Sequence, residues 1–213
     1  MSVFLDEMFS INDFTDTLVK NKKFYGCDFS KCNLTDTRFI NCLFYDDDRQ
    51  IGCDFSGALL KDASFSQCDL TMNNFKSIDG IGIEITNCKA LGANFHSASF
   101  MNKISTKIWF CSACITGNDL SYTNFTNVIL EKCELWENRW NNASVKTSNF
   151  SGSDLSGGDF SNFDWKSLNV TYCNLSNSNL GELDLRRTNL EGVILDSEQI
   201  KILVSNIGVI ISD

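Results

Sequence analysis

Ten cysteines and one histidine are the residues of this 213-residue chain whose types are best suited to catalysis or metal binding. Cys111 and Cys114 form a C-x-x-C pair, a spacing found in redox and zinc sites. No second C-x-x-C pair or nearby histidine accompanies it, so we interpret the pair as incidental. His96 has no cysteine or serine at a spacing that indicates a nucleophile and its base. The sequence therefore predicts no catalytic residue and no metal site.

Two further motifs are too weak to indicate a ligand. Asp46, Asp47 and Asp48 form an acidic run, but the ligand spacing of an EF-hand calcium loop is absent. Gly80 and Gly82 form an isolated G-x-G, which predicts a bulge or a close backbone approach and not a phosphate site. No cofactor is expected.

The other eight cysteines belong to a repeat with a period of five residues. Every fifth residue from Phe55 to Ile200 is large and apolar at all but three positions. The same period runs from Phe9 to Phe44 one residue out of phase, which indicates an inserted residue between the two frames. The three exceptions are Gly80, Ala90 and Ser105.

Each repeat unit also has a preferred small residue and a preferred turn residue. The eight cysteines, with many alanines, lie two positions before the large residue, where a thiol acts as a small buried hydrophobe. Asp or Asn often precedes the large residue and favours a turn by bonding to the local backbone. A unit that reads in, out, in, out, out supplies one side and one corner of a coil. Four units would close a square, and roughly nine coils would stack into a rod on the order of 45 Å long.

The fold class that this pattern predicts is all-β. Residues 1–195 would form the solenoid, interrupted by loops at 45–52 and 101–111, and residues 196–213 would form a C-terminal capping and dimerisation segment. Ser197 is expected to cap a short helix that protects the last coil. The tail beyond that helix is still apolar, which predicts a two-fold dimer joined at the C-termini. The residues expected at this contact are Ile200, Leu203, Val204, Ile207, Val209 and Ile210.

Composition restricts the partners and the compartment. The chain has no proline, as expected where almost every backbone N–H must donate to a ladder. Its first residues do not resemble a signal peptide, and no stretch is long and apolar enough to span a membrane. The net charge of −9 disfavours direct nucleic-acid binding. A cytoplasmic protein without membrane contact is the simplest expectation.

Successive units such as Cys53-Asp-Phe-Ser-Gly and Ala58-Leu-Leu-Lys-Asp resemble the pentapeptide-repeat family. Longer stretches, above all Leu130-Glu-Lys-Cys-Glu-Leu-Trp-Glu-Asn-Arg-Trp140, are similar to the Qnr quinolone-resistance proteins. The resemblance implies a right-handed quadrilateral β-helix. It also implies a cytoplasmic homodimer that binds DNA gyrase and topoisomerase IV and relieves their inhibition by quinolones.

The two interruptions of the repeat coincide with loops that Qnr proteins use against the topoisomerase, so the resemblance implies that they contact this partner. They could equally be tolerated insertions into the solenoid, although recognition is commonly placed on loops of a rigid scaffold. Loop 1 comprises Tyr45, Asp46, Asp47, Asp48, Arg49, Gln50, Ile51 and Gly52. Loop 2 is predicted to contribute Met101, Asn102, Lys103, Ile104, Ser105, Thr106, Lys107, Ile108, Trp109 and Phe110.

Rods of this kind have been compared with DNA, and charge tests the comparison. A dimer of roughly 90 Å would match DNA that carries about 50 charges, at one per ~1.7 Å. Two chains carry a net charge of only −18, twice the −9 of one chain. Shape and loop contacts must therefore contribute much of the specificity. A generic repeat scaffold and a gyrase-inhibiting interaction protein are the alternatives to the protective function, since a fold does not determine function.

Overall fold

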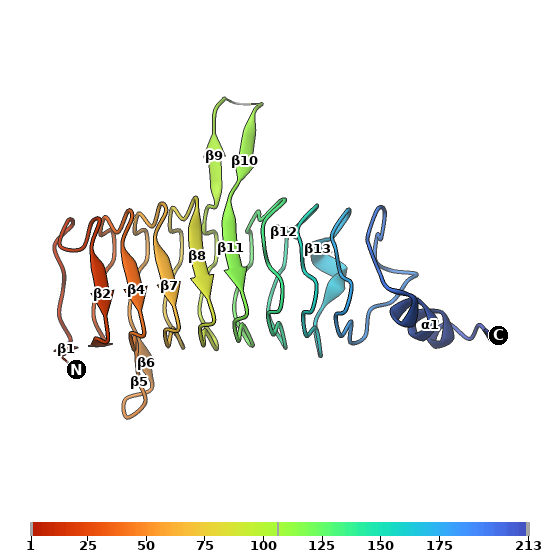
Figure 1. Cartoon of the computed structure of the whole chain (residues 1–213), viewed down its shortest axis with the longest axis horizontal. Helices are drawn as coiled ribbons and strands as arrows, with labels where there is room; N and C mark the ends of the chain where they lie inside the picture. Colours follow the sequence, from red (N-terminus) through yellow and green to blue (C-terminus); the bar gives the residue numbers. More distant parts are fainter. Residues whose placement is uncertain (1, 106, 212–213) are drawn as a thin grey trace.

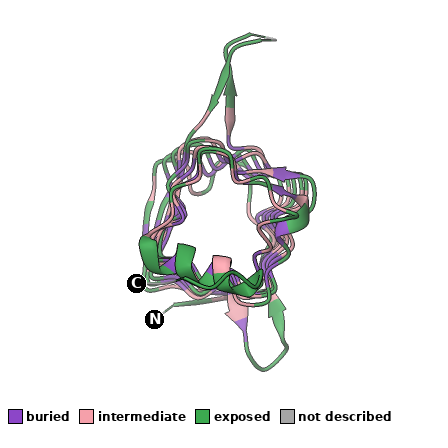
Figure 2. Ribbon diagram, turned by 90° about the vertical axis from the view of Figure 1, so that its right-hand side faces the viewer, coloured by how far each residue is buried: buried purple, intermediate pink, exposed green. Residues whose placement is uncertain are grey.

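The computed structural model describes residues 2–105 and 107–211. The chain winds into a rod of stacked coils, with two hairpins projecting from it and a helix at its C-terminal end (Figure 1). Viewed along the rod, the coils have a four-sided outline (Figure 2). The elements are β1 (Val3–Leu5), β2 (Leu18–Lys20), β3 (Lys23–Tyr25), β4 (Arg38–Ile40), β5 (Tyr45–Asp46), β6 (Ile51–Gly52), β7 (Ser64–Ser66), β8 (Ile83–Thr86), β9 (Met101–Lys103), β10 (Trp109–Cys111), β11 (Ala113–Thr116), β12 (Ser148–Asn149), the 3₁₀-helix η1 (Trp165–Ser167), β13 (Leu168–Asn169) and α1 (Ser197–Asn206).

Parallel pairing between coils forms the rod. The longest sheet has the strand order β11-β8-β7-β4-β2, and all of its neighbouring strands are parallel. Another ladder passes through nine successive coils, which agrees with the predicted number. Its members are Val3, Lys23, Leu43, Asp69, Lys89, Asp119, Arg139, Asp159 and Asn179.

The large residues of the repeat fill the rod as stacked columns. Phe75, Phe95 and Phe125 lie above one another with ring centroids 4.8 and 4.6 Å apart and interplanar angles of 7° and 13°. All three side chains are fully buried. The centroid spacing equals the spacing of neighbouring strands, so backbone pairing and ring stacking reinforce each other. The predicted phenylalanine and leucine core is confirmed.

The small inward residues have a second role that the sequence pattern did not reveal. The N–H of Cys42 donates to Sγ of Cys68 at 3.4 Å, and the N–H of Cys68 donates to Sγ of Cys88 at 3.3 Å. The next residue of this column is Asn118, whose Oδ1 accepts from the N–H of Cys88 at 2.7 Å. These side chains satisfy buried N–H groups that have no backbone acceptor, so they are hydrogen-bonding partners as well as packing residues.

The Asp and Asn residues make the local turn bonds that their positions predicted. Oδ1 of Asp69, for example, accepts from the N–H of Thr71 at 3.0 Å. Several of them also bond from coil to coil. Nδ2 of Asn94 donates to Asn74 at 3.2 Å, and Nδ2 of Asn74 donates to Asp54 at 2.9 Å. Each corner is therefore fixed both within its own coil and to its neighbour.

The register of the ladder measures the two insertions. Most paired residues are 20 apart, but Asp28 pairs with Asp54, 26 residues later, and Asn94 pairs with Asn124, 30 residues later. Loop 1 therefore adds six residues to its coil. Six is one more than a whole repeat unit, which accounts for the one-residue shift of the frame in the sequence. Loop 2 adds ten, a multiple of five, and leaves the frame unchanged.

The C-terminal cap differs from the prediction in its N-cap residue. Asp196, and not Ser197, is the N-cap of α1, and its side chain forms a reciprocal capping box with Gln199. Gln199 and Leu203 are the buried residues of the helix, whereas Ile200 is 47% exposed. The difference arises because the Gln199 side chain donates to the carbonyls of Leu175 and Ser178, and this anchors its face of the helix on the last coils.

Candidate partner-binding loops

Loop 1 is a short hairpin closed by the antiparallel pair β5–β6. Asp46 is only 7% exposed and accepts hydrogen bonds from the N–H of Asp48 and of Arg49 at 3.1 and 3.2 Å. Nε of Arg49 donates to the same carboxylate at 2.5 Å, and its Nη1 reaches Asp6 at 2.7 Å. Asp46 and Arg49 therefore hold the hairpin in shape and tie it to the N-terminal coil.

Charge and close packing both fix this geometry. The Arg49 guanidinium, which hydrogen-bonds to Asp46, lowers the pKa of that carboxyl. Gly52 lies so close to the next coil that an added Cβ would be 2.5 Å from the carbonyl carbon and oxygen of Met72. The exposed part of loop 1 is its tip, Asp47 to Ile51. Of the eight predicted residues, this tip is the part that a partner can reach.

Loop 2 is a longer hairpin built from β9 and β10. At its tip, Oγ of Ser105 accepts from the N–H groups of Lys107 and Ile108 at 3.3 and 3.1 Å. Four large apolar side chains are exposed on the described part of the hairpin, by 37 to 66% each. They are Ile104, Ile108, Trp109 and Phe110.

The five-residue frame is not a guide to burial inside loop 2. Ser105 and Phe110 fall at its large inward positions, yet both are exposed because the hairpin leaves the coil after Phe100. Thr106, also predicted as a loop-2 contact, lies outside the described residues. The remaining predicted loop-2 residues, from Met101 to Phe110, all lie on the projecting hairpin.

The two loops project from opposite sides of the rod, which both views of the molecule show (Figures 1 and 2). Loop 1 leaves its coil between Phe44 and Phe55, and loop 2 leaves between Phe100 and Ile115. A partner that contacts both must therefore embrace the rod or present two separate surfaces. A flat, one-sided contact could engage only one of them.

Charged side chains form different patterns on two sides of the rod. Asp69, Lys89, Asp119 and Arg139 alternate in sign along one side, with Nζ–Oδ2 and Nη1–Oδ2 distances of 3.6 and 3.3 Å. Another side carries a mostly acidic row in successive coils, formed by Glu84, Cys114, Glu134 and Asp154. The two sides therefore differ in charge pattern, one alternating in sign and the other mostly acidic.

Exposed apolar side chains continue beyond the cap. Of the residues predicted at a dimer contact, Leu203 is buried within its own chain and Val204 is half-buried. Ile207 and Val209 are 40% and 48% exposed, and Ile210 is 94% exposed. This end of the rod thus presents an apolar surface in the single chain.

The two cysteines of the C-x-x-C pair do not belong to a metal-ligating cluster of the described residues. Cys111 and Cys114 are half-buried free thiols, and the sulfur of Cys111 contacts the carbonyl of Ile129 and that of Cys114 the hydroxyl of Thr116. Within residues 2–105 and 107–211, no cluster of three or more metal-ligating side chains occurs. Nor does any helix in that part of the chain have the length and apolar character required to cross a bilayer.

Comparison with known proteins identifies the family to which this repeat rod belongs. The sequence profile described as "Pentapeptide repeats" matches residues 13–46, 51–79 and 169–197. The solved structure of full-length QnrB1, a plasmid-mediated fluoroquinolone resistance protein, is similar to the chain with a TM-score of 0.96 and 52% identity, and the match covers 98% of each chain. The chain belongs to the Qnr pentapeptide-repeat proteins.

Curated Qnr relatives agree with this assignment over a shorter length. The chain is 54% identical over 134 residues to the quinolone resistance pentapeptide repeat protein QnrB96 of Scandinavium goeteborgense. It is also 54% identical over 139 residues to the pentapeptide repeat protein QnrB4 of Escherichia coli. These alignments span 63% and 65% of both this chain and the respective relative. Qnr proteins are non-enzymatic resistance proteins, and the lack of a catalytic motif in the sequence agrees with that.

Proposed function

We propose that this Qnr protein binds bacterial DNA gyrase and topoisomerase IV and protects them from quinolones. The observation that carries the proposal is loop 2, a hairpin with Ile104, Ile108, Trp109 and Phe110 exposed on a rod that matches QnrB1 over 98% of its length. Exposed aromatic and aliphatic side chains on a fixed hairpin are suited to contact a protein surface. We place this activity in the cytoplasm, where the proposed targets act.

The charge pattern supports a limited contribution from DNA-like electrostatics. The acidic row supplies three charges in four successive coils, or one per ~6 Å, whereas DNA has one per ~1.7 Å. A neighbouring side carries alternating charges that neutralise one another. The rod would therefore compete poorly with DNA by charge alone, and the loops would provide most of the affinity and selectivity.

Gyrase supercoiling in the presence of a fluoroquinolone tests the proposal over a series of protein concentrations. We expect supercoiling to recover at substoichiometric to equimolar protein. Inhibition without recovery would instead support the gyrase-inhibiting alternative, and no effect at any concentration would leave only the scaffold. Topoisomerase IV decatenation with the same drug provides the parallel measurement.

Loop 2 is tested by Trp109→Ala together with Phe110→Ala. Both side chains project from the hairpin and contribute little to the core, so the rod should keep its stability. We expect the concentration needed for half-maximal protection to rise about tenfold or more. Trp136→Ala is the matched control, because Trp136 is a similarly exposed tryptophan (36%) on the acidic side. Equal loss in both variants would contradict a specific role of loop 2.

We further propose that the C-terminal segment joins two chains into a homodimer. Ile207, Val209 and Ile210 supply exposed apolar surface there, and burying it against a second copy would release it from water. Sedimentation equilibrium of the full chain should give the mass of a dimer, and Val209→Asp with Ile210→Asp should give a monomer. A dimer that persists in this variant would place the contact elsewhere.

A further inference from the structure

Two thiols lie together where loop 2 rejoins the rod. Cys111 ends β10, and its thiol donates to the carbonyl of Ile129 in the next coil at 3.5 Å. The thiol of Cys133 donates to the carbonyl of Glu131, two residues further along that coil, at 3.4 Å. The Cys111 sulfur also lies within hydrogen-bonding reach of the Glu131 carbonyl and of the Cys133 sulfur. The winding of the rod thus brings together two thiols that are far apart in the sequence.

The strand ladder explains why Cys111 meets Cys133 and not the other cysteine of the C-x-x-C pair. Cys114 pairs with Glu134 in the parallel ladder, so Ala113 lies opposite Cys133. Cys111 lies two residues before Ala113, and alternate residues of a strand face the same side. Cys111 therefore turns toward the small inward column that holds Cys133. Cys114 faces the opposite, outer side, where it belongs to the acidic row.

Cys111 is the thiol of the pair that is suited to react first. It is half-buried, whereas Cys133 is only 3% exposed. When Cys111 loses its proton, the S–H of Cys133 donates to the thiolate, which lowers the pKa of Cys111 and raises that of Cys133. Burial and the nearby carboxylates of Glu134 and Glu84 raise the pKa of Cys114. Because the thiolate is the nucleophile, Cys111 should be more reactive than either of the other two cysteines.

A hollow at the base of loop 2 gives small molecules a route to this thiol. It has a volume of about 620 Å³ and is lined by Met101, Lys103, Ser105, Trp109 and Ile129. Met101 is the ladder partner of Cys111 in the β9–β10 hairpin, and the carbonyl of Ile129 accepts from its thiol. The hollow therefore adjoins Cys111, and hydrogen peroxide is small enough to enter it.

We propose that Cys111 and Cys133 form a disulfide when hydrogen peroxide oxidises the protein, and that this bond fastens the base of loop 2 to the next coil. The thiolate of Cys111 attacks one peroxide oxygen, so that an S–O bond forms, the O–O bond breaks and hydroxide leaves to become water. The sulfur of Cys133 then attacks the sulfenic acid of Cys111, so that the S–S bond forms and the S–O bond breaks. The thiol proton of Cys133 leaves with the departing oxygen as water. The two thiols together lose two electrons, and the peroxide is reduced to two waters.

The disulfide changes the hinge of the hairpin. Bond formation draws the two sulfurs closer than a hydrogen bond does, so the base of loop 2 shifts toward the next coil. This restricts the motion of β9 and β10 relative to the rod. The bond itself does not depend on the proposed topoisomerase function, and its tests do not use a topoisomerase.

Non-reducing peptide mapping by mass spectrometry tests the bond in the full chain treated with hydrogen peroxide. The peptides of Cys111 and Cys133 should become cross-linked about tenfold or more faster than those of any other cysteine pair, and dithiothreitol should reverse the link. Cys42 and Cys68 are the internal control, because they lie in successive coils of the buried column. Equal rates at the two pairs, or a link between Cys111 and Cys114 instead, would overturn the proposal.

Two variants separate this pair from the C-x-x-C motif. Cys133→Ala should fold, because Ala113 and Ala143 occupy the same small position in other coils. In this variant Cys111 should proceed to the sulfinic acid, since no thiol is present to resolve its sulfenic acid. Cys114→Ala is the matched control and should form the disulfide at the unchanged rate. If Cys111 resisted further oxidation as well in Cys133→Ala as in the unmodified chain, Cys133 would not be its partner and the proposal would fail.

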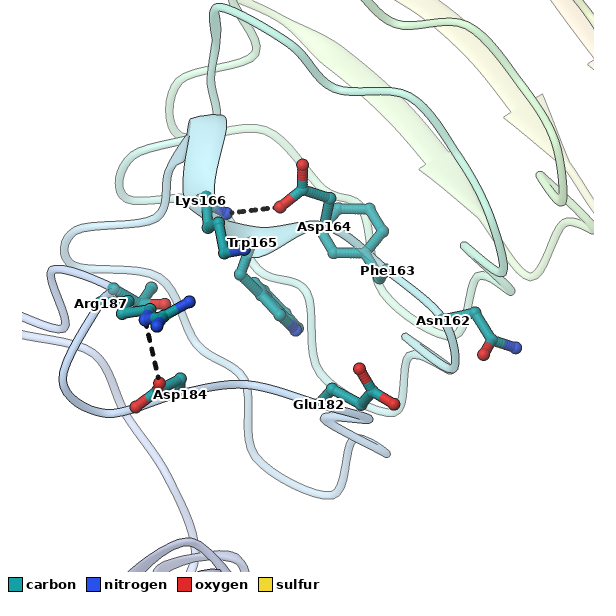
Figure 3. A pocket seen from close by; sticks show the side chains of 9 residues that line it. Asn162, Phe163, Asp164, Trp165, Lys166, Glu182, Asp184 and Arg187 are labelled. Carbon is teal, nitrogen blue, oxygen red and sulfur yellow. Dashed lines mark hydrogen bonds and ion pairs between the residues drawn. The ribbon is translucent and has the colours of Figure 1, made fainter. Parts of the chain in front are cut away.

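The indole N–H signals of two tryptophans, measured by NMR, test whether the bond fastens loop 2. Trp109 lies two residues before Cys111 on β10, so its signal should move on oxidation and return with dithiothreitol. Trp165 is the reference, since it lies in η1, closer to the C-terminal end, and its Nε1 donates to the carbonyl of Leu180 at 3.1 Å (Figure 3). A disulfide that forms without moving the Trp109 signal, or that moves both signals equally, would contradict the fastening.

Discussion

Asn138→Ala tests whether the small inward side chains hold the coils together by hydrogen bonds. Asn138 is 1% exposed. Its Oδ1 accepts from the N–H and from Nδ2 of Asn118 at 2.8 and 3.0 Å, and its Nδ2 donates to the carbonyls of Ile115 and Leu135. Alanine fits the same position sterically, as Ala143 does, so the change removes hydrogen bonds without adding bulk.

The magnitude follows from the groups that lose their partners. The N–H of Asn118 and the carbonyls of Ile115 and Leu135 are left unpaired, while Nδ2 of Asn118 retains the carbonyl of Ile85 at 2.8 Å. Each unsatisfied buried group costs about 1–3 kcal/mol and three such groups would cost about 3–9 kcal/mol, so Asn138→Ala should lower the free energy of unfolding by at least about 3 kcal/mol. If these side chains acted only as packing residues, the loss would be about 1 kcal/mol.

Urea denaturation followed by circular dichroism measures this difference, and Asn138→Ser is the matched control. Serine occupies the equivalent inward position at Ser153, where its Oγ accepts from the N–H of Cys133 at 2.9 Å and donates to the carbonyl of Leu130 at 2.5 Å. Asn138→Ser should therefore recover part of the loss and cost about 1–2 kcal/mol. Equal destabilisation by alanine and serine, or a loss below about 1 kcal/mol for alanine, would refute the hydrogen-bonding role.

Three further predictions concern loop 1 and the thiols. Gly52→Ala places a Cβ 2.5 Å from backbone atoms of Met72 and should cost about 1–3 kcal/mol, seen as a lower melting temperature in calorimetry; an unchanged value would contradict the close approach. Because Arg49 lowers the pKa of Asp46, the pair stabilises the fold at pH values above the ordinary carboxyl pKa and loses this effect as the pH falls through the lowered value. The NMR signal of Arg49 Hε should therefore shift only below about pH 4, and a shift near neutral pH would refute this account. Burial raises the pKa of Cys173 to about 11, so iodoacetamide at pH 8 should label the two half-buried thiols first, and mass spectrometry showing early labelling of Cys173 would exclude this protection.

The sequence by itself determined the repeat architecture. A period of five with large, small and turn residues at fixed positions leaves little choice, because each unit must bury the same two side chains and turn the same corner. From Phe55 to Phe100 the columns form as the pattern predicted, and the positions of the two loops follow from breaks in that pattern. The Qnr assignment rested on similarity of longer segments, which the period alone does not contain.

Only the tertiary structure decided how the irregular residues are used. Asp46 lies in a predicted contact loop, yet it is buried and its carboxylate accepts a hydrogen bond from Arg49. The Arg49 guanidinium also donates to Asp6, 43 residues earlier in the chain. Phe110 fits the five-residue frame but is exposed, because it lies in a ten-residue insertion that projects from the rod. Phe163 is larger than the residues at the same inward position of earlier coils, and the 3₁₀-helix η1 follows it in place of the regular backbone. Such outcomes depend on contacts between residues from different coils, which a local pattern does not specify.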